Sequence, residues 1–272
     1  MKLVQLKLVL TLLTFCTATL TLAAPNLMLF PTRIVFDKNK RAYQVDLTNT
    51  GSETGIYRIS LENKRMTDIG KFISVSQLSP GELSAENIIQ FSPRQVELAP
   101  GAGQTIRIIL RKPADLPIGE YRSHLVFTRI PDPSAKPVAN GSVAILTPMI
   151  GASIPIIVNN GATTSEVKLT DLKYLKAKQN ETAVLEFNIE RKGARSVYGD
   201  LIVNYKAKGE QEKEIAYVKG IAVYSPNSLR IVKVSLQSEN NKQLTPGKLT
   251  LKYAESRESG GKVLGEANIE IP

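Results

Sequence analysis

The sequence predicts an all-β protein made of two β-sandwich domains, and three observations support this. Apolar side chains alternate with polar ones, as at Tyr43, Val45 and Leu47, which is the period of a half-buried strand. The apolar runs are rich in Val, Ile, Thr and Tyr and are separated by Pro and Gly. The chain has 272 residues, a length that favours two medium-sized domains over one large one.

The strands expected in the first domain follow this pattern in order. Residues 43–47 and 57–61 alternate apolar and polar side chains, and the turn cluster 49–53 between them contains the Asn and Gly that a hairpin requires. The pattern continues through residues 104–111, 120–129 and 143–158.

A domain boundary is expected near Asn160, which gives a first domain of residues 24–160 and a second of residues 161–272. Asn159, Asn160 and Gly161 form a turn signal after the longest apolar run. A second set of strands is expected at residues 167–172, 183–189, 197–205, 216–224 and 249–253. Helix is expected to be slight, with one short turn within residues 79–89, where Pro80 can start it.

Residues 1–23 have the layout of a secretory signal peptide. Lys2 and Lys7 precede an apolar run at residues 8–15, which is too short to span a bilayer, and small residues follow. Cleavage before Ala24 is expected, and the mature chain then has no cysteine. The alternative interpretation is a lipoprotein signal, in which Cys16 is the signal's cysteine. No later run reaches the roughly 20 apolar residues of a membrane helix, so we expect an exported, soluble protein without membrane insertion.

The scarcity of reactive residue types argues against catalysis. The chain has one His and one Cys, which excludes clustered Cys/His zinc sites, Cys–His nucleophilic pairs and disulfides within the chain. His124 lies inside a strand pattern, and a lone His there is more often a strand residue than a general base. We therefore expect no enzyme activity, no metal and no cofactor.

The charge balance points to acidic partners. Lys and Arg number 35 against 25 Asp and Glu, a net charge of +10, so carboxylates, phosphates, acidic surfaces and anionic membranes are the partners to consider. The basic residues are spread through both halves with few neighbouring aromatics, so a nucleic-acid partner is not expected.

One run is unlike the others: residues 141–158, GSVAILTPMIGASIPIIV, carry no charge. It is longer than the usual strand of 3 to 10 residues. One interpretation is two buried strands joined at Gly151. The other is a long strand whose leading part lies at a sheet edge and offers alternate apolar side chains to a partner, since exposed edges normally carry charge or Pro.

The sequence resembles the PapD-like periplasmic chaperones of the chaperone/usher pathway, most closely their non-classical members. The segments that carry the resemblance follow one another in the family order: NLMLFPTRIVFD at 26–37, YQVDLTNTGSETGIYRISL at 43–61, FSPRQVELAPGAGQTIRIIL at 91–110, LPIGEYRSHLVFTRIP at 116–131, and the uncharged run. In the second half, VYGDLIVNY and IAVYSPNSLRIV are similar to the divergent members.

The resemblance implies two immunoglobulin-like domains in a boomerang and a periplasmic protein that captures pilus or fimbrial subunits. Such subunits lack the last strand of their own sandwich; the chaperone lends its long strand and delivers the complex to an outer-membrane usher. Whether empty copies dimerise through this strand stays open. The alternative is an exported immunoglobulin-like structural or adhesin module with the apolar strand buried in its own sheet.

The resemblance implies that Arg33 corresponds to the arginine that lies in the cleft of the family's members. This arginine would bind the subunit's C-terminal carboxylate. The family's second anchor, a strand lysine, aligns with Pro155, which cannot make that contact. Arg122 and Arg94 are then the nearest candidates, unless the protein has the different anchor of a non-classical branch.

The donor positions implied by the same alignment share one face of the uncharged strand: Ala144, Leu146, Pro148, Ile150 and Ala152. The opposite face is nearly as apolar: Val143, Ile145, Thr147 and Met149. Glu120 aligns with a glutamate of an interdomain salt bridge, whose partner aligns near Asn159.

Overall fold

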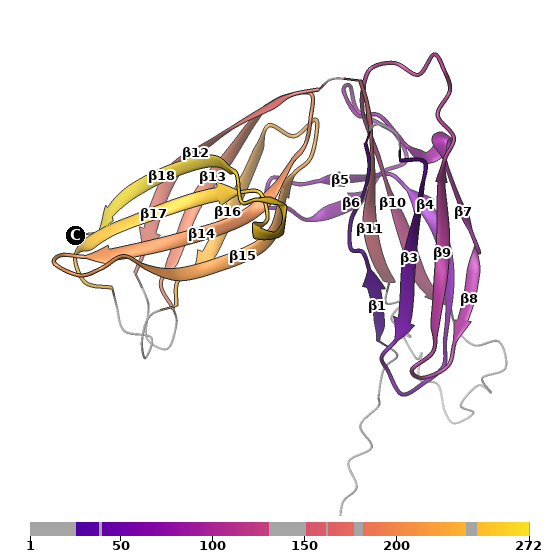
Figure 1. Ribbon diagram of the computed structural model, residues 1–272, viewed down its shortest axis with the longest axis horizontal. Coiled ribbons are helices and arrows are strands. Elements are labelled where there is room, and N and C mark those ends of the chain that lie inside the picture. The colour runs from indigo at the N-terminus through magenta and orange to yellow at the C-terminus, as the bar shows by residue number, and fades with distance from the viewer. Residues whose placement is uncertain are drawn as a thin grey trace, which may run out of the picture.

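The computed structural model describes residues 26–37, 40–130, 151–161, 163–176, 182–237 and 244–271. It confirms the all-β fold: two sandwiches lie at an angle to each other and give the molecule a bent, two-lobed shape (Figure 1). Among the described residues the only helices are two 3-10 turns, η1 (Glu86–Ile88) and η3 (Arg257–Ser259). The first of these lies within the segment where a short helical turn is expected.

The first domain packs a five-stranded sheet on a four-stranded one. The five-stranded sheet has the order β2-β11-β10-β4-β8, and the four-stranded sheet the order β1-β3-β9-β7. The strands are β1 (Leu27–Phe30), β2 (Ile34–Phe36), β3 (Ala42–Asn49), β4 (Gly55–Glu62), β7 (Ile89–Ser92), β8 (Gln95–Leu98), β9 (Gly103–Leu110), β10 (Gly119–Ile130) and β11 (Gly151–Asn160).

The chain changes sheet at two points in this domain, each marked by a proline. Pro31 separates β1, which pairs with β3, from β2, which pairs with β11. Pro93 separates β7, which pairs with β9, from β8, which pairs with β4. Proline has no N–H to donate to a strand ladder, so both prolines stand where pairing stops.

The core of the first domain lies between the two sheets and follows the alternation seen in the sequence. Val45 and Leu47 of β3 face Ile59 of β4 and Phe127 of β10 across it, and all four are buried. Because the side chains of a strand alternate between faces, the residues between them point outwards and are more polar.

The second domain packs a three-stranded sheet, in the order β12-β13-β16, on a four-stranded sheet in the order β15-β14-β17-β18. Its core includes Phe187, Leu201, Leu251 and Tyr253, all buried. The strands are β12 (Ser165–Leu175), β13 (Val184–Gly193), β14 (Val197–Ala207), β15 (Lys213–Val223), β16 (Leu229–Ser235), β17 (Gly247–Ala254) and β18 (Val263–Ile271).

A hairpin of the first domain, β5 (Lys64–Met66) and β6 (Phe72–Ser74), reaches across to the second domain (Figure 1). Met66 is 1% exposed and belongs to the hydrophobic core of the second domain. Its carbonyl accepts a hydrogen bond from the Asn227 side chain at 2.7 Å, and the Asp68 carbonyl accepts one from the Ile231 N–H at 2.7 Å. The hairpin therefore joins the two sandwiches.

Replacing Met66 by Ala should destabilise the protein although the residue lies outside the second domain's own strands. Removing a fully buried methionine side chain leaves a cavity, and we expect the free energy of unfolding to fall by about 2–5 kcal/mol. Urea unfolding followed by circular dichroism measures the change. Met28→Ala is the matched control, since Met28 is 55% exposed and should change stability little. Equal losses in the two variants would contradict the docking of the hairpin.

Candidate functional site

Arg33 lies in the short link between β1 and β2, where the chain changes sheet, and it faces the second domain. Its guanidinium carbon lies 4.4 Å from the centroid of the Tyr198 ring of β14. Its Nε is buried and has no hydrogen-bond partner among the described residues. The ring stabilises the cation, and Arg33 also lines an interdomain cleft, where its guanidinium can meet an anion.

A cleft of about 610 Å³ opens beside Arg33 between the two domains. Arg33 and Asp37 line it from the first domain, and Arg195 and Lys262 line it from the second. Arg195 pairs with Asp37 at 3.7 Å, and Lys262 forms no ion pair within the described part of the chain. The cleft thus brings together three cations from both domains, and the carboxylates of Asp37, Glu120 and Glu255 also line it.

Glu120 lies at the same junction but is occupied by hydrogen bonds. Its carboxylate accepts the Ser196 N–H at 2.8 Å and the Ser196 hydroxyl, and this hydroxyl in turn accepts the Ser225 N–H at 2.9 Å. Glu120 therefore connects the first domain to two segments of the second. In the family alignment, the salt-bridge partner of this glutamate falls near Asn159. The Asn159 side chain instead donates a hydrogen bond to Asp37 at 2.6 Å. Ser196 carries no sequence signal that would have identified it.

Arg122 lies at the junction of the two domains, where it is buried. It is 9% exposed, its guanidinium carbon lies 4.6 Å from the centroid of the Tyr224 ring, and it donates to the Lys64 carbonyl at 3.3 Å. Burial lowers the pKa of Arg122, and the nearby Tyr224 and Glu120 act in the opposite direction. Arg122 thus packs between the domains and is not among the residues that line the cleft.

Arg94 is not brought to the cleft at all. It precedes β8, at one edge of the five-stranded sheet, whereas Arg33 precedes β2, at the opposite edge. Arg94 is exposed and lies over Phe91, with its guanidinium carbon 5.4 Å from the ring centroid. The order of strands therefore places Arg94 and Arg33 at opposite edges of the five-stranded sheet.

β11 contains the last part of the uncharged run, and its side chains divide between two cores. Ile154, Ile156 and Val158 belong to the core of the first domain, and Ile157 to that of the second. Pro155 pairs in register with His124, and Ala152, half-buried, with Phe127. The other expected donor positions, Ala144, Leu146, Pro148 and Ile150, and the signal peptide at residues 1–23 lie outside the described residues.

The two edges of β11 differ. β10 pairs with all of β11 on one side, whereas β2 pairs on the other side with only Ile156, Ile157 and Val158. On that second side, no described strand lies beside residues 151–155. The strand therefore has an open edge at its start, at the point where β1 has moved to the other sheet.

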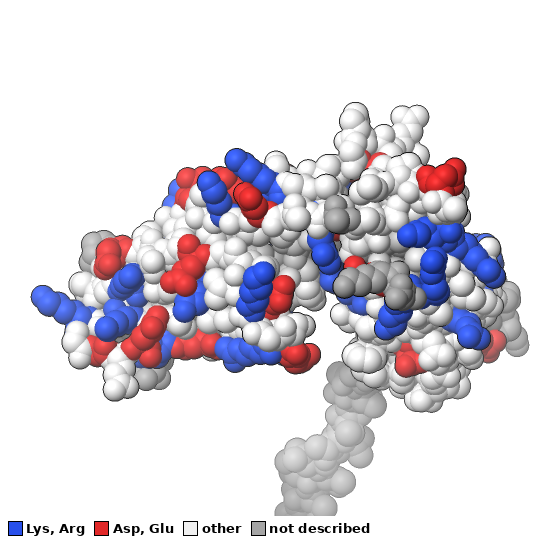
Figure 2. Space-filling view, turned by 45° about the horizontal axis from the view of Figure 1, so that its top comes forward, with Lys and Arg blue, Asp and Glu red and all other residues white. Residues whose placement is uncertain are grey.

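The charges on the surface agree with an acidic partner for the first domain. Figure 2 shows Lys and Arg side chains gathered on the visible face of the first domain, whereas both signs are interspersed on the second. Such a distribution raises the local concentration of negatively charged partners.

His124 of β10 is buried under the hairpin and is not placed for catalysis. Its ring lies 4.7 Å from that of Phe72, and neither ring nitrogen has a hydrogen-bond partner among the described residues. Burial, together with the positive charges of Arg122 and Lys64, lowers its pKa from 6.5 to about 3. In the described ranges no group of three or more His, Cys, Asp and Glu side chains could hold a metal ion. No helix within these ranges is long and apolar enough to cross a bilayer.

No protein-family model matches the sequence, and no curated protein matches it. Solved structures similar to the chain include the CsuC chaperone of the archaic chaperone-usher Csu pili of Acinetobacter baumannii, in complex with the tip adhesion subunit CsuE (16% identity, 90% of this chain and 98% of that chain, TM-score 0.44). A second is the class 5 fimbriae chaperone CfaA (15% identity, 91% of this chain and 100% of that chain, TM-score 0.43). A third is the E. coli chaperone DraB (14% identity, 91% of this chain and 96% of that chain, TM-score 0.41). All three are chaperones.

His124 should make the protein sensitive to acid. Below pH 6.5 the unfolded chain binds a proton at this group, and the folded chain binds none until about pH 3, so the free energy of unfolding falls as the pH drops through this window. The loss should reach about 2–3 kcal/mol near pH 4.5. The His124→Phe variant keeps every carboxylate of the natural chain and lacks only the histidine. Urea titrations across this range should therefore show a smaller loss of unfolding free energy for His124→Phe than for the natural chain. Parallel pH profiles would contradict the buried, neutral histidine.

Proposed function

We propose that the protein is a periplasmic chaperone that holds pilus or fimbrial subunits by donating a strand to them and delivers them to an outer-membrane usher. The observation that carries the proposal is the open edge at the start of β11. Residues 151–155 pair with β10 on one side only within the described structure, and the chain that leads into them is uncharged. An uncharged strand with an open edge is suited to complete a sheet of another protein.

The family alignment favours one face of the uncharged run for the subunit, and Ala152 is the described residue of β11 that belongs to this set. Ile154, Ile156 and Val158 face the first-domain core. If the period of two continues towards the N-terminus, the same face carries Ala152, Ile150, Pro148, Leu146 and Ala144. At roughly 25 cal/mol per Å² of buried apolar area, three or four such side chains contribute several kcal/mol before the cost of ordering.

Arg33 is the proposed anchor for the C-terminal carboxylate of the subunit, and the cleft offers a substitute for the missing strand lysine. Arg195 and Lys262 line the same cleft from the second domain. A carboxylate has two oxygens and accepts charge-assisted hydrogen bonds from more than one donor. We therefore assign the second contact to Arg195 or Lys262 instead of Arg122 and Arg94.

The double variant Leu146→Arg/Ile150→Arg should abolish capture of subunits. Two guanidinium groups would have to enter the apolar groove that the missing strand leaves in the subunit, where an unpaired charge is strongly unfavourable. The measurement is co-purification from the periplasm with a pilus subunit, which the natural chain should retain in a one-to-one ratio. Ile145→Arg/Met149→Arg places the same charges on the opposite face and should retain the subunit.

The reverse pattern would assign the other face to the subunit. Retention of the subunit by both double variants would exclude strand donation and favour an exported structural or adhesin module.

Arg33→Gln should remove the preference of the protein for a free C-terminal carboxylate. We expect the natural chain to bind a subunit with a free C-terminus about tenfold or more tightly than the same subunit with a C-terminal amide, since hydrogen bonds to charged groups contribute about 1.5–3 kcal/mol. The variant should bind both forms equally and lose about 1–2 kcal/mol of stability, a value between those of an exposed and a desolvated cation–π contact, because the Arg33 Nε is buried. Arg107→Gln, an exposed arginine of β9, is the control. A preference that survives in Arg33→Gln would exclude this anchor.

A further inference from the structure

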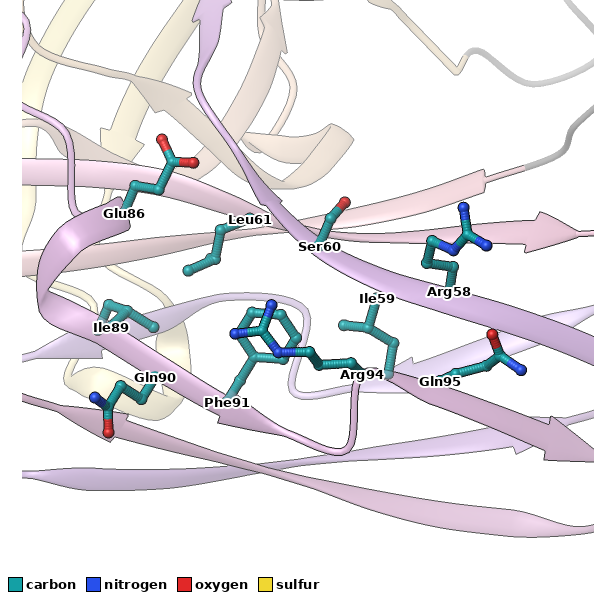
Figure 3. Close-up of a pocket in the computed structure, with 10 residues that line it drawn as sticks. All are labelled: Arg58, Ile59, Ser60, Leu61, Glu86, Ile89, Gln90, Phe91, Arg94 and Gln95. Atoms are coloured by element: carbon teal, nitrogen blue, oxygen red, sulfur yellow. The ribbon is translucent and has the colours of Figure 1, made fainter.

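A second open edge lies on the first domain, far from the cleft, where the chain passes from β7 to β8. The hollow there has a volume of about 800 Å³. Its walls come from β4, from η1 with β7, and from the start of β8 (Figure 3). Since the two sheets part at this point, the hollow is a groove between a strand of each.

The groove exists because β8 accompanies β4 along only half of its length. β8 pairs with Gly55–Arg58, and the last contact on that side is the Ile59 N–H to the Arg94 carbonyl at 2.9 Å. Beyond this point the chain belongs to the other sheet, as β7. Residues 60–62 of β4 therefore have no paired strand on that side within the described structure.

The main chain of β4 is oriented to pair with an added strand. Alternate residues of a strand direct their N–H and C=O groups to the same side. Since the Ile59 N–H points to the β8 side, the N–H and C=O of Leu61 point there too, into the groove. An extended segment lying there would continue the line of β8 beside β4.

The side chains of the groove define what that segment should contain. Its floor is apolar, with Ile59 and Ile89 buried and Leu61 and Phe91 partly buried against the core. Figure 3 shows these side chains between the two strands, with Arg94 lying across the ring of Phe91. A strand placed there would direct every second side chain onto this floor, and apolar residues fit those positions.

The rim carries two cations without acidic partners. Arg58 and Arg94 are exposed, and neither forms an ion pair in the part of the chain that the structure describes. The one acidic side chain of the lining, Glu86, already accepts a hydrogen bond from Asn63 at 3.1 Å. The charge of the groove is therefore complementary to carboxylates.

We propose that this groove binds an extended, acidic segment of a partner protein, in which apolar and acidic residues alternate, by adding it as a strand to β4. The apolar residues pack on Leu61 and Phe91, the carboxylates pair with Arg58 and Arg94, and the main chain pairs with Leu61. The site is separate from the cleft and from β11, so it does not depend on the chaperone function proposed above.

The test uses the full mature chain and a short blocked peptide that alternates glutamate with valine. Fluorescence anisotropy of the labelled peptide should show binding that weakens with salt, and amide NMR shifts should include Leu61. Arg58→Ala/Arg94→Ala should lower the affinity about tenfold or more, while Lys206→Ala, an exposed lysine of β14, should leave it unchanged.

Two further peptides separate strand addition from charge attraction. A peptide with lysine in place of glutamate should not bind. A glutamate–valine peptide methylated on its backbone nitrogens keeps the carboxylates but cannot pair, and it should bind about tenfold or more weakly. Equal binding of the methylated and unmethylated peptides, or of the double variant and the natural chain, would overturn the proposal. So would self-association of the natural chain that Arg58→Ala/Arg94→Ala abolishes, since a second copy would then occupy the groove.

Discussion

The contact on which the arrangement of the two domains depends is the packing around Tyr224. This side chain is 3% exposed, and the guanidinium carbon of Arg122 lies 4.6 Å from its ring centroid. Phe72 of the hairpin lies 5.9 Å away, centroid to centroid. Burial raises the pKa of Tyr224, although Arg33 and Arg122 both favour its ionised form. The tyrosine therefore stays neutral and offers its ring to the cation.

This packing also compensates for buried charge. Arg122 has an Nη1 with no hydrogen-bond partner among the described residues, and an incompletely paired buried cation is unfavourable. A desolvated cation–π contact returns about 2 kcal/mol. The second domain thus stabilises a charge that belongs to the first, and separating the domains would remove that contribution. The same junction sets the cleft, whose cations Arg33 and Arg195 come from different domains.

The sequence alone predicted the strands well, because a half-buried strand leaves its period of two in the residues themselves. β4 and β9 both lie where alternation placed a strand. The hairpin β5–β6 was missed, since strands of three residues are too short to show a period. Its docking depends on Met66, whose burial is set by the second domain. No local pattern can indicate such a contact.

The residues of the candidate site also divide into those that the sequence indicated and those that it could not indicate. The resemblance identified Arg33 from its motif, and the structure places it at a cleft. Arg94 could not be placed from the sequence, because strand order within a sheet is a property of the whole domain. Ser196, which hydrogen-bonds Glu120 across the junction, lies between β13 and β14 with no motif around it. The donor positions from Ala144 to Ile150 stay predictions.

The two changes of sheet explain why open edges occur where they do. A strand that crosses from one sheet to the other leaves its former neighbour uncovered beyond the crossing point. At Pro31 the uncovered neighbour is the start of β11, and at Pro93 it is the end of β4. Each open edge has arginine nearby, Arg33 at the first and Arg94 at the second. A two-sheet sandwich with two such crossings can therefore offer two strand-accepting edges without any change to its core, since the core side chains lie on the strands that remain paired.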